Sequence, residues 1–284
     1  MRLGSHLPPA PVLALIACLS GCLSPSAAER AELAVQRQRL EVAEAMFQER
    51  CKTAGEKIHR TAENVEGVLL MKLRPSNIND GNQFAMDDPY GSDLGGDGYI
   101  VSFLRGSHQA NTRGTPRPGA PPRIGYLFVE AVDPTDGKRY RYTGSVKAVR
   151  RKDVNAENVR RALAENPAYD LNVYAYVVDR APAPGAAPRY GITYDDISTR
   201  EEREYWIAGS SLRVIDLKTG EVMAERIGYM MDRGQGATWG GRAPWLLAAN
   251  HACPGFGTTR HAAAAQGRQA QDFAEKVLKP RMEE

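Results

Sequence analysis

Hydrophobic and polar residues follow a helical period near the start of the chain. Over residues 27–55, apolar positions recur at helical spacing between arginine, glutamate and glutamine residues, and they are Leu33, Leu40, Ala43, Phe47 and Cys51. Gly55 suits the C-terminal cap of such a helix. The pattern therefore predicts an amphipathic helix with a single apolar stripe.

After this helix the pattern changes to short apolar or alternating runs. They predict β-strands at residues 68–73, 99–104, 124–132, 138–145, 171–178, 189–194, 205–215 and 222–231. Turn-forming residues stand at 133–137 and 218–220, between runs that suit hairpin partners. A short helix is expected over residues 155–165 and a last one over 261–278.

The order helix, strands, helix predicts an α+β fold. We expect a mostly antiparallel β-sheet with an N-terminal and a C-terminal helix packed on it, in a single domain over residues 27–284. Two long segments interrupt it: residues 77–98 are rich in Asp, Gly and Asn, and residues 105–123 in Pro, Gly and Arg. We expect both to be mobile loops.

The first residues have the character of an export signal. A weakly basic start precedes an apolar run over residues 12–19, which is too short to span a bilayer permanently. The run ends in Leu-Ser-Gly-Cys, which resembles the bacterial lipoprotein box. That resemblance implies a signal peptide at 1–21, an acylated Cys22 and a tether at 22–26; the alternative is an ordinary secretory signal cut elsewhere. Leu23 after the cysteine implies, by resemblance to enterobacterial sorting, the periplasmic side of the outer membrane.

Cysteine usage agrees with export. Of the four cysteines, Cys18 leaves with the signal and Cys22 takes lipid. Cys51 and Cys253 then remain in an oxidising compartment, where two leftover thiols usually pair. We expect a disulfide between them, the alternative being two buried free thiols.

Charge and aromatic residues suggest where a partner binds. The 37 basic and 34 acidic residues leave a net charge of +3, which argues against a nucleic-acid partner. Residues 138–152 form the densest basic region, with Arg139, Arg141 and Arg151. Such a region can bind lipid head groups, an acidic protein or an anionic polymer. The alternative is a solvent-exposed face with no partner. The glycine-rich stretch 229–245 carries Tyr229, Trp239 and Trp245, which are either anchors for a protein partner or a cover over the core.

Motifs for catalysis are missing from the sequence. There is no Gly-x-Ser-x-Gly elbow, no His-Glu-x-x-His and no phosphate-binding glycine loop. Asp195 and Asp196 are adjacent, so in a strand they point to opposite faces. The acidic segment around Asp93 fails as an EF-hand because Leu104 stands where a bidentate glutamate is needed, although an irregular calcium site stays open. We expect no cofactor, no bound metal and no catalytic residues.

Two blocks, residues 49–75 and 194–232, resemble uncharacterised lipoproteins of proteobacteria, a family that implies no activity. The hypothesis is a lipid-anchored, periplasm-facing, non-catalytic lipoprotein that binds a protein partner, with toxin-neutralising immunity as one form of that role. The alternatives are an envelope enzyme acting on lipid or cell-wall material, and a structural lipoprotein of envelope assembly.

Overall fold

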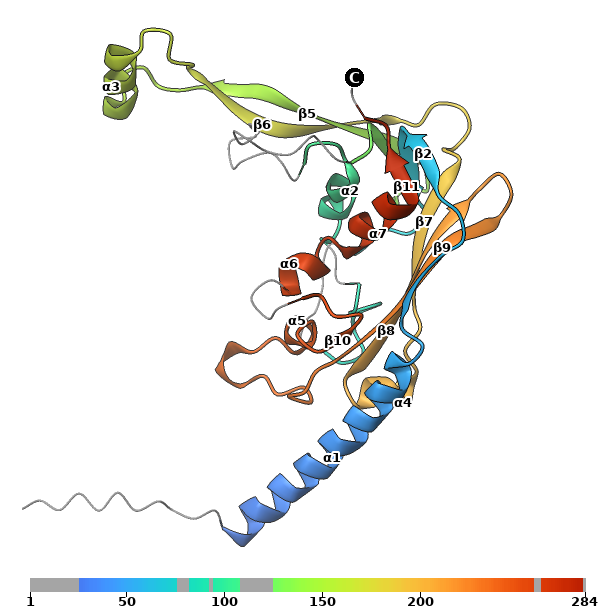
Figure 1. Ribbon diagram of the computed structural model, residues 1–284. Coiled ribbons are helices and arrows are strands. Elements are labelled where there is room, and N and C mark those ends of the chain that lie inside the picture. Colours follow the sequence, from blue (N-terminus) through green and yellow to red (C-terminus); the bar gives the residue numbers. More distant parts are fainter. Residues whose placement is uncertain (1–25, 76–81, 92–93, 108–124, 258–261, 283–284) are drawn as a thin grey trace, which may run out of the picture. The chain divides into compact units, whose positions relative to one another are not determined.

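The computed structural model describes residues 26–75, 82–91, 94–107, 125–257 and 262–282 (Figure 1). The helices are α1 (Ala27–Cys51), α2 (Asp97–Phe103), α3 (Glu157–Glu165), α4 (Arg200–Glu204), the 3-10 turn η1 (Trp239–Gly241), α5 (Pro244–Ala248), α6 (Ala262–Gln266) and α7 (Gln269–Val277). The strands are β1 (Gly55–Ile58), β2 (Ala62–Val65), β3 (Gly67–Leu70), β4 (Phe128–Val132), β5 (Arg139–Arg151), β6 (Asn172–Pro182), β7 (Tyr190–Asp196), β8 (Ile207–Asp216), β9 (Glu221–Met231), β10 (Ala252–Cys253) and β11 (Leu278–Pro280).

The chain forms two compact units, residues 1–38 and residues 39–284. The described part of the first unit is the beginning of α1, where every side chain is exposed, Leu33 included. In the second unit the remaining turns of α1 bury Ala43 and Phe47 in a cluster with strand residues of β8 and β9. The predicted stripe is therefore confirmed over its second half, where Ala43 and Phe47 pack on the sheet.

The second unit is built on a nine-stranded sheet with the order β1-β9-β8-β7-β3-β4-β5-β6, and β10 pairs with β9. Most neighbours are antiparallel, but β3 runs parallel to both β4 and β7. Strand β3 has a neighbour on each side, and its Val68 and Leu70, which share one face, are fully buried, whereas Leu69 on the other face is half-buried. The α+β class with a mostly antiparallel sheet is confirmed.

Helices α2, α5, α6 and α7 lie on one side of this sheet (Figure 1). The main core joins α2 and α7 to the middle strands, with Tyr99, Phe103 and Phe273 facing Ile192 and Leu212. A second cluster packs α5 on β8 and β9. Both clusters bury large aromatic side chains, so the helices on this face supply much of the apolar area that stabilises the unit.

Two expectations about elements are wrong, and several short strands were missed. Residues 99–103 lie in helix α2 and not in a strand. A short, mostly buried apolar run carries too little periodicity to distinguish a helix from a strand, and here Tyr99, Ile100 and Phe103 are all buried. The last helix is two helices, α6 and α7, followed by β11. Short strands β1, β2, β10 and β11 were not predicted.

The two segments expected to be mobile loops, residues 77–98 and 105–123, can be compared with the structure only where it describes them. In the first segment, Met86, Asp88 and Tyr90 are buried, so its middle belongs to the core. Of the second segment the structure describes residues 105–107; the rest, like the signal peptide, Cys22 and the tether, lies outside the described residues.

Candidate functional site

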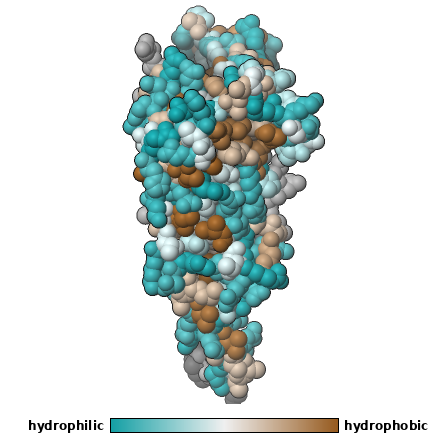
Figure 2. Space-filling view, turned by 90° about the vertical axis from the view of Figure 1, so that its right-hand side faces the viewer, coloured by the Kyte–Doolittle hydropathy of each residue, from teal (hydrophilic) through white to brown (hydrophobic). Residues whose placement is uncertain are grey.

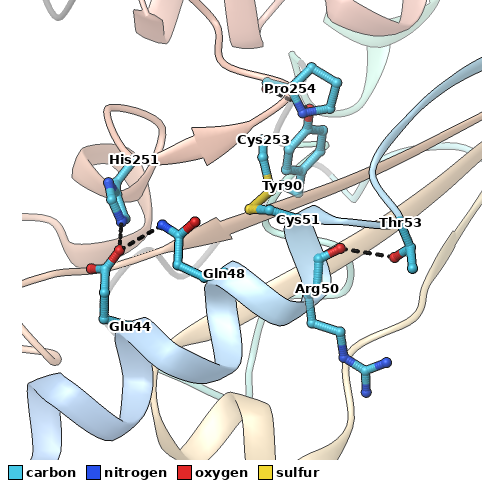
Figure 3. Close-up of a disulfide and its surroundings, with 9 residues drawn as sticks. All are labelled: Glu44, Gln48, Arg50, Cys51, Thr53, Tyr90, His251, Cys253 and Pro254. Carbon is cyan, nitrogen blue, oxygen red and sulfur yellow. Dashed lines mark hydrogen bonds and ion pairs between the residues drawn. A yellow bond between two sulfur atoms is a disulfide. The ribbon is translucent and has the colours of Figure 1, made fainter.

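The expected disulfide is present and joins the end of α1 to β10 (Figure 3). The Cα atoms of Cys51 and Cys253 are 5.6 Å apart, a normal separation for such a bond. Earlier in the helix, Glu44 accepts a hydrogen bond from Gln48 and contacts His251 Nε2 at 3.2 Å. Partial burial alone would raise the pKa of Glu44, but the bond from Gln48 and the proximity of His251 outweigh it and hold that pKa below its ordinary value. The last turns of α1 are thus fixed by a covalent bond and a polar contact together.

The predicted aromatic anchors do not form one surface. Tyr229 on β9 and Trp245 in α5 are 5% and 1% exposed, and the indole N–H of Trp245 donates to the carbonyl oxygen of Asn82 at 3.0 Å. Trp245 also packs on Trp206, with 5.1 Å between ring centroids. Trp239 in η1 is 80% exposed. Two of the three residues therefore stabilise the core, and of these three Trp239 alone is open to a partner.

Two of the three predicted arginines serve a buried carboxylate. Glu130 on β4 is fully buried, and it is bracketed by Arg139 at 2.9 Å and by Arg141 at 2.8 Å from the neighbouring strand β5. The guanidinium of Arg141 also lies 3.8 Å from the centroid of the Phe128 ring. A buried carboxylate needs such compensation, so these arginines are already engaged. Arg151, at the far end of β5, is exposed.

Two aspartates of the acidic segment considered for calcium, Asp87 and Asp88, and the adjacent Asp195 and Asp196 pair with basic side chains. Asp88 is buried against Arg74 at 3.0 Å and accepts a hydrogen bond from Ser210 at 2.9 Å. Asp196 pairs with Arg203, and Asp195, on the opposite face of β7, pairs with Arg213. No group of three or more His, Cys, Asp or Glu residues suited to a metal ion occurs within the described ranges. Asp80 and Asp93 lie outside those ranges.

The feature with the clearest geometry for binding is a β-ribbon. Pairing between β4 and β5 ends at Thr143, whereas β5 and β6 continue to pair as far as Arg151 and Asn172. β6 is the last strand of the sheet. Residues 144–178, which we call the arm, are therefore a two-stranded ribbon with α3 in its connection (Figure 1). Both outer edges of the ribbon carry backbone groups that no strand among the described residues pairs with.

One face of the arm is aromatic and continues from the core. Cross-strand partners share a face, and Val146 pairs with Tyr176 while Ala148 pairs with Tyr174. Tyr176 lies over Gly144, where a Cβ atom would stand 1.9 Å from its hydroxyl oxygen. That hydroxyl donates to the carbonyl oxygen of Arg105 at 2.9 Å. Beyond this contact, the residues of both strands are half-buried or exposed.

The far end of the arm carries uncompensated positive charge. Arg150, Arg151 and Arg160 are exposed and form no ion pair with any residue that the structure describes. Their neighbours differ: Lys147 pairs with Asp179 at 2.6 Å, and Arg161 pairs with Glu157 at 3.0 Å. The arginines are therefore available to an acidic surface.

One further face of the molecule can be compared with the arm. Figure 2 shows one face of the molecule, on which hydrophobic residues form separate groups surrounded by hydrophilic ones. Contiguous apolar patches, rather than scattered residues, mark protein-binding surfaces. Among the helices that the structure describes, none is both long and apolar enough to cross a bilayer.

Comparisons with known proteins add little. No protein-family model matches the chain, and no curated protein matches it. Among solved structures, a dodecamer of a PelC variant from Paraburkholderia phytofirmans superposes over 80% of this chain and 98% of that one, with 8% sequence identity and a TM-score of 0.29. A likeness this distant supports no transfer of function, and the resemblance of the two sequence blocks to uncharacterised lipoproteins stays a prediction.

Proposed function

We propose that this protein is a lipid-anchored, periplasm-facing, non-catalytic lipoprotein that binds a protein partner through the arm. The observation that supports this most is the ribbon over residues 144–178, both of whose outer edges lack a partner strand among the described residues. An isolated two-stranded hairpin is only marginally stable in water. A partner that covers the aromatic face or pairs with an edge would supply the missing contacts.

The chemistry of the arm favours an acidic protein over the other anionic surfaces. Open strand edges are completed by another polypeptide backbone, which neither a lipid head group nor a polysaccharide can supply. The half-buried Tyr174 offers the kind of rigid aromatic contact that is common in protein interfaces. Arg150, Arg151 and Arg160 then select a partner that presents carboxylates.

In-cell photo-crosslinking tests the proposal. A photoreactive amino acid replaces Val149, which is 50% exposed on the arm, and in a second strain it replaces Thr219 in the β8–β9 turn. We expect a discrete protein adduct from position 149 and none from position 219. Lipid adducts alone, or the same adducts from both positions, would contradict binding through the arm.

A charge-reversed variant makes the test specific. Replacing Arg150, Arg151 and Arg160 with glutamate should lower the adduct yield by about tenfold or more, because like charges then face each other across the interface. The matched control reverses three exposed arginines elsewhere, Arg200, Arg233 and Arg281. Equal losses in both variants would mean that the arm has no special role.

The identity of the adduct separates the forms that this function can take. A secreted toxin would make the protein an immunity protein, and a component of envelope biogenesis would make it a structural lipoprotein. Alanine variants of Asp195 and Asp196 test the enzyme alternative. They should form the same adduct and complement a deletion strain as the wild type does, since both carboxylates are paired with arginines.

A further inference from the structure

A pocket of about 380 Å³ lies between β9, the Pro254–Gly257 segment and α7. Its buried wall includes Arg226, Tyr90 and Phe273, and its rim carries the charged side chains of Glu56, Lys276 and Asp272. This volume is within the usual range for small-molecule sites. The pocket shares no residue with the arm.

Arg226 is the unusual member of this pocket. It is 3% exposed, and its Nε and Nη2 atoms have no hydrogen-bond partner within the described part of the chain. Its guanidinium lies 5.0 Å from the centroid of the Tyr90 ring. An arginine stays charged in a protein, and leaving that charge buried without an anion is unfavourable.

The carboxylates around the pocket are engaged elsewhere. Glu56 stands directly opposite Arg226 across the β1–β9 pairing, but its oxygens accept from Lys276 Nζ at 2.8 and 2.9 Å. Asp272 pairs with Arg268 at 3.1 Å. The buried Arg203 makes a useful contrast, because it has both a carboxylate, that of Asp196, and a backbone carbonyl beside it.

We propose that this pocket binds a small organic carboxylate, whose anion pairs with Arg226 and whose apolar part packs between Phe256 and Phe273. The planar guanidinium fork matches a planar carboxylate. The half-buried Phe256 lines the pocket with its ring centroid 4.9 Å from that of Tyr90, and Ala265 adds to this apolar lining. The apolar lining favours an organic carboxylate over inorganic phosphate, which has no apolar part to pack against it.

Binding of benzoate to the purified mature protein in detergent tests the assignment, with benzamide as an uncharged probe of the same shape and inorganic phosphate as the competing anion. Calorimetry should show saturable binding of benzoate and much weaker binding of both others. No binding of benzoate, or equal binding of benzamide, would overturn the proposal. Tighter binding of phosphate would overturn the choice of a carboxylate.

Variants locate the site. R226M should weaken benzoate binding by about 10- to 100-fold, the range expected when hydrogen bonds to a charged group are lost. F256A removes a half-buried aromatic ring from the apolar lining of the pocket, and it should weaken benzoate binding by about tenfold. R160M, at an exposed arginine of α3, is the matched control and should bind as the wild type does.

The melting temperature of the R226M variant is a second test of the proposal. Because the substitution removes an unpaired buried charge and keeps an apolar side chain of similar length, the unliganded variant should melt at or above the wild-type temperature. A strongly lowered melting temperature, with wild-type binding of benzoate by F256A, would show that Arg226 has a structural partner and would overturn the proposal.

Discussion

Removing the Cys51–Cys253 bond should destabilise the protein by about 3–5 kcal/mol. The two cysteines are 202 residues apart, and the loop-entropy relation for a crosslink over that length gives an upper value of about 5 kcal/mol. Other native contacts join the same elements: Phe47 is buried beside Tyr229, and Glu44 contacts His251. Most of the effect should therefore come from the larger freedom of the unfolded chain.

Urea unfolding measures this change in the double variant C51A/C253A and in wild type with and without reductant. The variant and the reduced wild type should unfold at the same lower midpoint, and reductant should leave the variant unchanged. Thiol labelling of the unfolded, unreduced protein should find neither Cys51 nor Cys253 reactive. Coincident curves for oxidised and reduced wild type, or two reactive thiols per chain, would refute the reasoning.

Three further outcomes follow from single positions. Gly228→Ala should lower the free energy of unfolding by about 1–3 kcal/mol, because the new Cβ atom would stand 2.2 Å from the ring of Tyr90. An unchanged midpoint in urea would contradict this. Hydrogen bonds, chiefly from Arg189, hold the pKa of Asp216 well below its ordinary value of 3.8. The ionised carboxylate therefore stabilises the fold at neutral pH, and this stabilisation is lost as the pH falls from 3.8 through the lowered pKa of the folded state. Asp216→Asn should therefore lower the melting temperature at pH 7 and converge with wild type in strong acid, whereas a constant difference would count against the linkage. Mass spectrometry should find the mature protein starting at an acylated Cys22; any other N-terminus would remove the proposed anchor.

The parts of the fold with a clear period could be predicted from the sequence. The apolar stripe through Phe47 placed α1, and the turn at 218–220 placed the β8–β9 hairpin, because each depends on neighbours along the chain. The parallel contacts of β3 depend instead on residues more than fifty positions away, and no local pattern encodes them. Helix α2 was missed because its apolar run is short and mostly buried, so its period does not distinguish a helix from a strand.

The candidate sites were harder to predict for the same reason. From the sequence, Arg139 and Arg141 belong to a basic patch that is open to a partner. Only the register between β4 and β5 shows that both arginines pair with Glu130. Of the arm, the sequence predicted the helix and the strand at 171–178, but it ended the other strand at residue 145, whereas β5 continues to Arg151. The lack of further neighbours is a property of the whole sheet. Arg226 did leave a signal: it occupies a position of β9 on the same face as Ala224 and Met230, which are fully buried.

Deletion of the arm tests the central claim most directly. Replacing residues 147–175 with Asn-Gly joins Val146 to Tyr176, which are cross-strand partners, through a two-residue hairpin turn. The shortened protein should keep the wild-type melting temperature and the disulfide, since the core residues are untouched. Chemical crosslinking of intact cells should then show a complex of the wild type with its partner that the shortened protein does not form. A well-folded shortened protein that still forms the same complex would contradict binding through the arm.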